Sequence, residues 1–129
     1  MEASLTPAAP SRGLNIAAWV ASGLLCALFL FAGPPKWMGA QPAVDGFRSF
    51  GFSDGFRIFI GLAETAGAIG LLIPRLSFWA ACGLIPIMIG AVHTHVTHPE
   101  AGPPIGPVVA LVLLGLVAFV RRKQAMFLS

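Results

Sequence analysis

Charged side chains are scarce in this chain of 129 residues. They make up 10% of it, whereas a typical soluble domain carries about 25%. This deficit excludes an ordinary soluble domain and, with 57% hydrophobic residues, predicts a membrane protein whose main partner is the lipid bilayer. Because each helical crossing needs about 20 apolar residues, the chain has room for about four spans in one domain.

Cysteine is scarce as well. Cys26 and Cys82 both lie inside apolar runs, so the sequence excludes a disulfide framework and a CxxC redox pair. It also lacks haem and iron–sulfur ligation patterns, so any redox centre must belong to a partner or a diffusible cofactor. The formal charge of +3 comes from residues at the ends of apolar runs, such as "RRK" at 121–123. Their position argues against nucleic-acid binding and for membrane anchoring.

The apolar runs predict an all-α, integral membrane, antiparallel four-helix bundle. Its spans are expected at residues 14–32, 55–73, 76–92 and 105–120. The first run exceeds the roughly 7 to 15 apolar residues of a signal peptide, so we expect it to be retained. "GPP" at 33–35 is expected to end it, because proline has no amide hydrogen. Pro74 marks a short turn between the second and third spans, and Pro86 is tolerated inside the third.

The segments outside the spans are expected to lie in tails and loops. We expect a disordered tail at residues 1–13, the four-helix domain at 14–123 and a short C-terminal tail at 124–129. The first loop is too polar to cross a bilayer, and Ser53 and Asp54 at its end can cap the next helix. "HTHVTHPEAGPP" at 93–104 is read as the second loop. The aromatic residues of the first loop suit the membrane interface: Trp37, Phe47, Phe50 and Phe52.

Lysine and arginine are distributed unequally between the two ends of this bundle. One end holds Arg12, Arg75, Arg121, Arg122 and Lys123, and the other holds Lys36, Arg48 and Arg57. Five against three predicts a multi-pass protein of the cell membrane with both termini in the cytoplasm. The first loop and the histidine loop then share the outer face.

Glu64 interrupts the apolar run "GLAETAGAIGLL". An acid within a membrane span is expected to face the bundle interior and to pair there. At 1.5 Å per residue, Glu64 lies roughly 12 Å below the outer end of its helix. Lys36 at the end of the first span and His93 at the end of the third are the predicted partners in a polar pocket. On the same helix, Gly61 leaves room beside the carboxylate, and other small residues permit close helix packing.

Other interpretations of these residues stay open. Glu64 is either an acid that handles protons or grips a ligand, or a structural partner in an interhelical ion pair. Lys36 and Arg57 each fit a headgroup anchor as well as a pocket role, and for Arg57 the anchor is favoured. No metal site is predicted from His93, His95, His98 and Glu100, since histidines two apart face opposite sides of a helix and no further ligand completes a recognised set.

Three motifs resemble those of the DoxX-like small membrane proteins: "FLFAGPPKWMG", "GLAETAGAIGLLIP" and "GAVHTH". The resemblance covers residues 14–120 and matches at Lys36, Glu64, His93 and His95. It implies a four-helix membrane fold. Members of this family are linked to quinone-coupled oxidation of thiosulfate, where a related protein is an oxidoreductase subunit, and to thiol and oxidative-stress complexes.

With this resemblance, the first hypothesis is a redox-associated subunit whose pocket handles a quinone or a small sulfur species. Glu64 and His93 would exchange protons, Lys36 would hold a negative group, and Trp37, His95 and Arg57 would contact the cofactor. An oxidoreductase in the membrane or in solution would be its partner. The alternatives are a non-catalytic scaffold that stabilises a partner, and a transporter, which would need a homodimer because four helices are few for alternating access.

Overall fold

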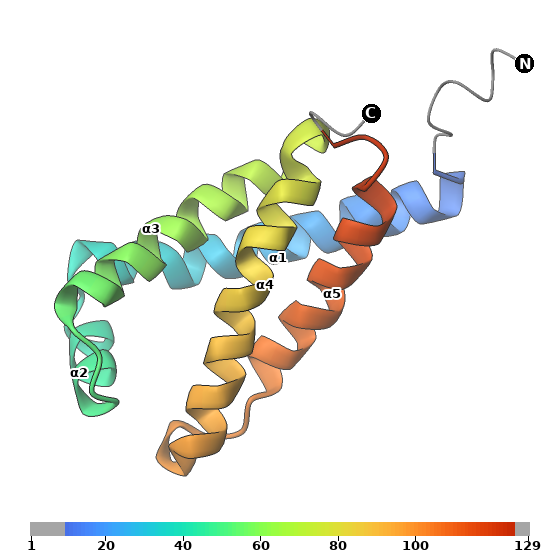
Figure 1. Ribbon diagram of the computed structural model, residues 1–129. Helices are drawn as coiled ribbons and strands as arrows, with labels where there is room; N and C mark the ends of the chain where they lie inside the picture. The colour runs from blue at the N-terminus through green and yellow to red at the C-terminus, as the bar shows by residue number, and fades with distance from the viewer. Residues whose placement is uncertain (1–9, 126–129) are drawn as a thin grey trace, which may run out of the picture.

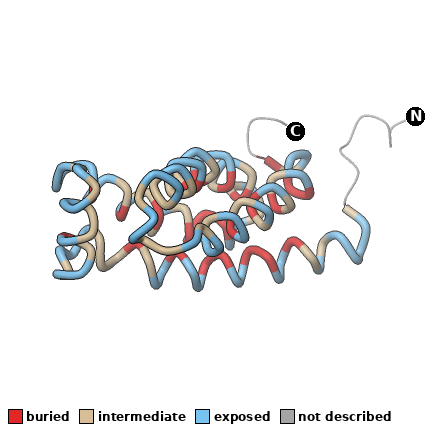
Figure 2. Tube along the Cα trace, turned by 90° about the horizontal axis from the view of Figure 1, so that it is seen from below, coloured by how far each residue is buried: buried red, intermediate tan, exposed pale blue. Residues whose placement is uncertain are grey.

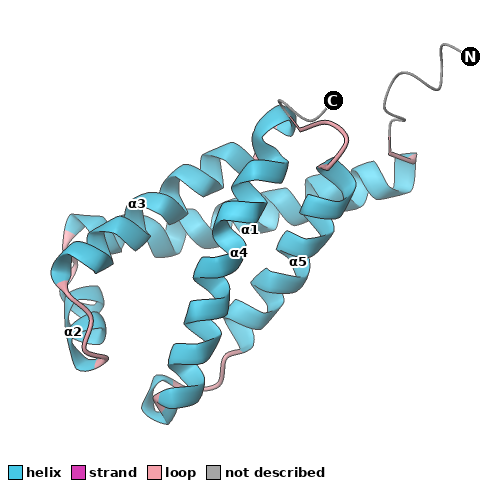
Figure 3. Ribbon diagram, in the orientation of Figure 1, coloured by secondary structure: helices cyan, strands magenta, loops and turns pink. Residues whose placement is uncertain are grey.

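The computed structural model describes residues 10–125, and within them the chain is helical and contains no strand (Figure 3). The elements are α1 (Arg12–Met38), α2 (Gln41–Ser49), α3 (Asp54–Leu71), α4 (Pro74–Thr97), the short 3-10 helix η2 (Pro99–Ala101) and α5 (Ile105–Arg121). The all-α prediction is confirmed, although α2 was expected to be loop. Of the two predicted tails, residues 1–9 and 126–129 lie outside the described residues.

The four long helices pack in a ring. α1 lies against α3 and α5, and α4 lies against the same two helices. Their buried positions face the interior (Figure 2), where Leu25, Phe29, Leu84 and Leu114 are at most 2% exposed. α4 leaves the end of α3 at an angle, so these two helices separate toward the end of the bundle that carries α2 and η2 (Figure 1).

The first helix is longer than predicted. It continues through Pro34 and Pro35 to Met38, and it ends where Gly39 takes a left-handed conformation (φ 78°) and its amide bonds the Pro35 carbonyl. A residue before proline usually avoids helical angles because its Cβ meets the proline ring, and Gly33 has no Cβ. The expectation that "GPP" ends this helix is therefore wrong, and Lys36 and Trp37 stand on a helix.

The fourth helix also extends past its predicted end. It runs to Thr97, so His93 and His95 lie on its last turns and not in a loop. Pro86 stands inside it, as predicted. The short turn before it is confirmed: α3 ends at Leu71 and α4 begins at Pro74. Buried Ser77 donates its hydroxyl hydrogen bond to the Leu71 carbonyl (2.7 Å), which the end of α3 leaves without a helical partner.

The outer surface of the bundle is apolar. Phe31, Phe59 and Val112 are 83%, 63% and 68% exposed, and such a surface suits contact with lipid. Within residues 10–125, α1 and α4 are the two helices long and apolar enough to cross a membrane, and α5 is apolar but shorter, at 17 residues. The exposed apolar surface and these helices agree with the membrane protein that the composition predicts.

Candidate functional site

A cavity of about 500 Å³ lies where the long helices separate. Three helices contribute residues spaced by four, which share one helical face. These are Leu28, Ala32 and Lys36 of α1, Phe56, Ile60 and Glu64 of α3, and Ile87, Ala91 and His95 of α4. The start of α5 adds Gly106 and Pro107. The walls are thus mainly apolar, and the charged groups Lys36 and Glu64 face each other across α1 and α3.

Four phenylalanines from α2, the segment after it and the start of α3 cover the cavity. Phe47, Phe50, Phe52 and Phe56 all line it, and the rings of Phe52 and Phe56 are tilted with centroids 5.0 Å apart. Phe47 lies 5.8 Å from Phe52 and 6.4 Å from Phe56, separations typical of aromatic clusters. Sequence analysis places Phe47, Phe50 and Phe52 at the membrane interface, whereas the fold turns them to the cavity.

The predicted pairing of Glu64 is found with Lys36. Lys36 Nζ lies 2.8 Å from Glu64 Oε1 and donates a hydrogen bond to the Ala32 carbonyl (2.9 Å), so the lysine stem bends back into the bundle. Glu64 is 3% exposed. Apart from this contact with Lys36, Oε1 has no hydrogen-bond partner among residues 10–125. A carboxylate oxygen can accept two hydrogen bonds, so Oε1 can take a second donor besides Lys36.

Two glycines bring this pair together. A Cβ on Gly61 would lie 2.7 Å from Lys36 Cβ and 2.8 Å from the Gly33 carbonyl oxygen, and one on Gly33 would lie 2.6 Å from Thr65 Oγ1. The backbones of α1 and α3 therefore touch at Gly33 and Gly61. Lys36 follows Gly33 by three residues and Glu64 follows Gly61 by three, so both side chains emerge on the cavity side of this crossing.

His95, and not His93, lines the cavity. His95 Nδ1 lies 3.1 Å from the Gly102 carbonyl oxygen, and because a carbonyl only accepts, Nδ1 must carry a hydrogen and neutral His95 has Nε2 as its basic nitrogen. His93 is exposed and does not line the cavity. Two residues rotate about 200° around a helix, so only one of the two histidines can face inward. The predicted place of His93 in the pocket is therefore taken by His95.

Trp37 and Arg57, two predicted cofactor contacts, serve the α1–α3 packing instead. Trp37 Nε1 donates to Thr65 Oγ1 (3.1 Å), and Trp37 does not line the cavity. Arg57 is 6% exposed, and its Nε donates to the Lys36 carbonyl (3.1 Å). It thereby bonds one of the carbonyls that α1 leaves free at its C-terminus, where a positive charge is favourable. The membrane-interface anchor expected for Arg57 does not fit its burial.

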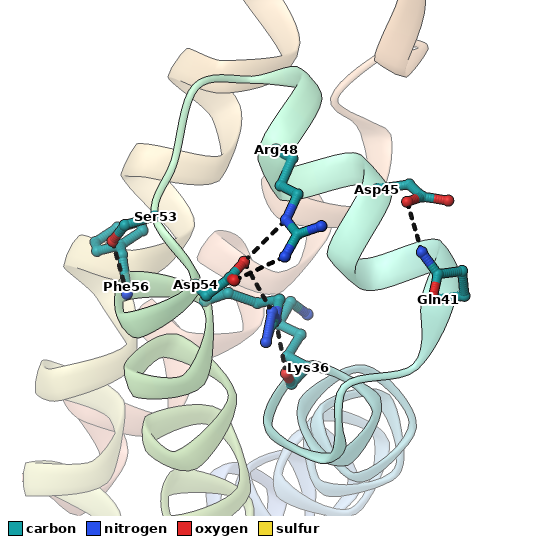
Figure 4. Close-up of polar contacts among 8 residues, drawn as sticks. Lys36, Gln41, Asp45, Arg48, Ser53, Asp54 and Phe56 are labelled. Atoms are coloured by element: carbon teal, nitrogen blue, oxygen red, sulfur yellow. Dashed lines mark hydrogen bonds and ion pairs between the residues drawn. The ribbon is translucent and has the colours of Figure 1, made fainter.

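An ion pair fastens α2 to the start of α3. Figure 4 shows Arg48 reaching from α2 to Asp54, where Nε and Nη2 donate to the two carboxylate oxygens at 3.2 and 2.8 Å. This hydrogen bonding lowers the pKa of Asp54 below its ordinary value of 3.8. Ser53 accepts a hydrogen bond from the Phe56 amide (3.1 Å), so the predicted helix cap is confirmed. Arg48, before Phe52 in the chain, and Ser53, after it, thus both bond to the first turn of α3. These bonds hold the aromatic cover against α3.

Residues spaced by four line the cavity on three helices, but this spacing does not identify the cavity histidine from the sequence. Apolar residues stand four and eight positions before both His93 and His95. The aromatic cover was missed because α2 has only nine residues. The sequence signal for this helix is Pro42 in its first turn, followed by Val44 and Phe47, two apolar residues three positions apart. In the described ranges, no three His, Cys, Asp or Glu side chains are grouped to hold a metal ion.

Comparison with known proteins supports the resemblance carried by the motifs. The model of the DoxX-like family matches residues 20–119, which includes every residue that lines the cavity. Neither the curated proteins nor the solved structures contain a match to the chain.

Proposed function

Because this chain belongs to the DoxX-like family, we propose that it is a redox-associated multi-pass membrane protein whose cavity binds a neutral, lipid-soluble ring compound of the quinone class. The observation that carries this proposal is the cavity itself, whose lining is apolar and aromatic apart from four polar side chains: Lys36, Glu64, Thr94 and His95. Its volume of about 500 Å³ falls in the range of about 300 to 1,000 Å³ usual for small-molecule sites.

The charges at the cavity favour a neutral ligand over a small sulfur anion. Lys36 is neutralised by Glu64 at 2.8 Å, so the pair offers no net positive charge. Arg57, the other buried cation nearby, points to the Lys36 carbonyl and does not line the cavity. An anion would leave water for apolar walls without a free cation, which is unfavourable. A flat ring would instead stack against the phenylalanines.

The polar groups are placed to handle the oxygen atoms of such a ring. A bound quinone would supply the electron transfer that the chain's own side chains cannot supply. Lys36 holds a donor at the cavity, Glu64 an acceptor, and His95 a basic Nε2 whose ring is oriented by the Gly102 carbonyl. Glu64 and His95 are therefore the candidates to exchange protons with the ring, and His95 takes the role first expected of His93.

The proposed arrangement in the membrane has four spans, α1, α3, α4 and α5, with both termini in the cytoplasm. Arg121 Nη1 donates to Asn15 Oδ1 (2.8 Å), which ties the end of α5 to the start of α1 at the more basic end of the bundle. The cavity then opens in the outer half. Tags at each terminus should be reached by a membrane-impermeant reagent from the cytoplasmic side only; labelling of either tag from outside refutes this orientation.

Replacing Glu64 by glutamine tests the proposal, because glutamine keeps the size of the side chain and removes its charge. Glu100→Gln is the matched control, since Glu100 is exposed and away from the cavity. We expect Glu64→Gln to lose about 1.5 to 3 kcal/mol of affinity for a short-chain quinol, whose hydroxyl can donate to the carboxylate, which is roughly ten- to a hundredfold in Kd. Quinone reduction in membranes should fall with it, while Glu100→Gln should match the wild type.

A scaffold without catalysis is the competing function, and the close α1–α3 crossing at Gly33 and Gly61 favours it. In that case Glu64 only locks α3 to α1. Glu64→Gln would then lower the melting temperature in detergent while quinone binding, if any, stayed as in the control. Unchanged binding and unchanged quinone reduction in a folded Glu64→Gln variant would refute the proposed function.

A further inference from the structure

The hydrogen-bonding capacity of the ion pair restricts which form of a ring ligand suits the cavity, an inference that rests on the proposed function. Glu64 is buried, with 3% exposure, and apart from Lys36 its Oε1 has no hydrogen-bond partner among the described residues. Lys36 Nζ, 2.8 Å away, uses one hydrogen for the Ala32 carbonyl. An ammonium group has three hydrogens, so with one on Ala32 and one toward Glu64, Lys36 keeps a third, and Oε1 can accept one more bond.

A quinone carbonyl meets only half of this pattern. The carbonyl oxygen accepts, so it can bond Lys36, but it has no hydrogen for Glu64 Oε1. Its lone pairs would lie beside those of the Glu64 carboxylate, and Oε1 would gain no second donor, which is unfavourable in a buried site. A phenolic hydroxyl meets both halves, because it donates to Glu64 and accepts from Lys36 with the same oxygen.

We infer that the cavity selects a ring that bears a hydroxyl group, so that the reduced quinol, and not the quinone, is the form it holds most tightly. The aromatic walls do not discriminate between the two forms, since both are flat rings of nearly the same size. Discrimination comes from Glu64, which remains a pure acceptor while it is ionised beside Lys36. Sites built to bond a hydroxyl reject analogues that lack it, because their own polar groups are left unpaired.

Binding of three matched ligands to the purified full chain in detergent tests this inference. The ligands are a short-chain benzoquinol, its quinone and its dimethyl ether, with the same tail, titrated calorimetrically without oxygen and with a reductant present for the quinol and its ether. We expect the quinol to bind at least tenfold more tightly than either of the others. The ether has the ring and its oxygens but no hydrogen to donate, so it isolates the hydroxyl.

The variants Glu64→Gln and Glu100→Gln then show whether Glu64 causes the preference for the quinol. A glutamine amide both donates and accepts, so Glu64→Gln should bring the quinol-to-quinone affinity ratio close to one, while Glu100→Gln keeps it. Equal or tighter binding of the quinone by the wild-type chain would overturn this inference and leave the proposed function standing. Absence of binding by all three ligands would overturn both. The wild-type comparison decides the matter even if Glu64→Gln fails to fold.

Discussion

At the scale of single residues, Lys36 and Glu64 hold opposite charges in a cavity whose other lining residues are mainly apolar. Burying such a pair gains little net stability, and apolar residues of similar size are often as stable or more so. Lys36 keeps 19% of its side chain exposed and Glu64 4%, so neither group is released to bulk water. The proposed ring ligand would give this pair a role besides stability.

The double replacement Lys36→Met with Glu64→Leu separates these two roles. Removing both charges together leaves no unpaired partner, so we expect the melting temperature in detergent to stay equal to that of the wild type or to rise. Binding of the ring ligand should be lost. A double variant that unfolds, or that binds as tightly as the wild type, would show that the pair is structural.

Histidine replacements test which ring faces the ligand. We expect His95→Ala to weaken ligand binding by about 0.5 to 1.5 kcal/mol, up to roughly tenfold in Kd, because it removes one neutral hydrogen bond. His93→Ala is the matched control on the same helix and should leave Kd unchanged. If the two variants exchanged these results in a binding titration, the assignment of His95 to the cavity would be wrong.

Residue spacing explains how far this site was predictable. Lys36 and Glu64 were expected to converge, and the structure brings them to 2.8 Å. His93 was expected beside them because its helix was thought to end there, and an extra turn of α4 gives the cavity position to His95. A helix end is set by local hydrogen bonds, such as the His98 amide to the Thr94 carbonyl (2.8 Å), which the apolar pattern does not reveal.

At the scale of helices, the crossing of α1 and α3 positions the site. Gly61 meets the backbone at Gly33 and Trp37 on α1, each 2.8 Å from a Cβ placed there. The neighbours are mainly main-chain atoms, which cannot rotate out of the way. The sequence predicted room beside Glu64 at Gly61, and the structure shows that another backbone fills it.

Gly61→Ala should therefore push the two helices apart. We expect a loss of about 1 to 3 kcal/mol in the free energy of unfolding, as for other overpacked positions, and weaker ligand binding because Lys36 moves from Glu64. Gly23→Ala in α1 is the control: nothing lies within 4 Å of its Cβ, so it should gain about 0.5 to 1 kcal/mol in helix stability. Equal unfolding free energies for the two variants, measured by denaturant titration in detergent, would contradict this close crossing.

The connection between α2 and α3 predicts a dependence on pH. Arg48 lowers the pKa of Asp54 below 3.8 by hydrogen bonding. Because this pKa is lower in the folded chain than in the unfolded one, the pair stabilises the fold above the ordinary pKa, and this contribution is lost as the pH falls through the lowered value. Carbon-13 NMR of the Asp54 carboxyl should give a midpoint below 3.8. Arg48→Met should raise it toward the ordinary value, and identical midpoints would disprove the bridge.

At the scale of the whole molecule, composition predicts more of the structure than any single motif does. Little charge and long apolar runs predicted an all-α membrane protein, and α5 (Ile105–Arg121) lies within one residue of the span expected there. The cavity was less accessible to sequence reasoning, because it depends on the angle between α3 and α4 and on α2 folding over the gap. The position of α2 involves contacts between segments far apart in the chain, such as the rings of Phe50 and His98, whose centroids are 4.8 Å apart.

The central claim is that a ring ligand binds inside the bundle, between Lys36, Glu64 and the phenylalanine cover. Photolabelling of the full chain in membranes with an azido-benzoquinol, followed by peptide mass spectrometry, tests it most directly. The account predicts labels within residues 28–36, 47–56 and 86–95, removed by excess unlabelled quinol and lost in Glu64→Gln but not in Glu100→Gln. Labels confined to the exposed apolar surface, and unaffected by competitor, would contradict it.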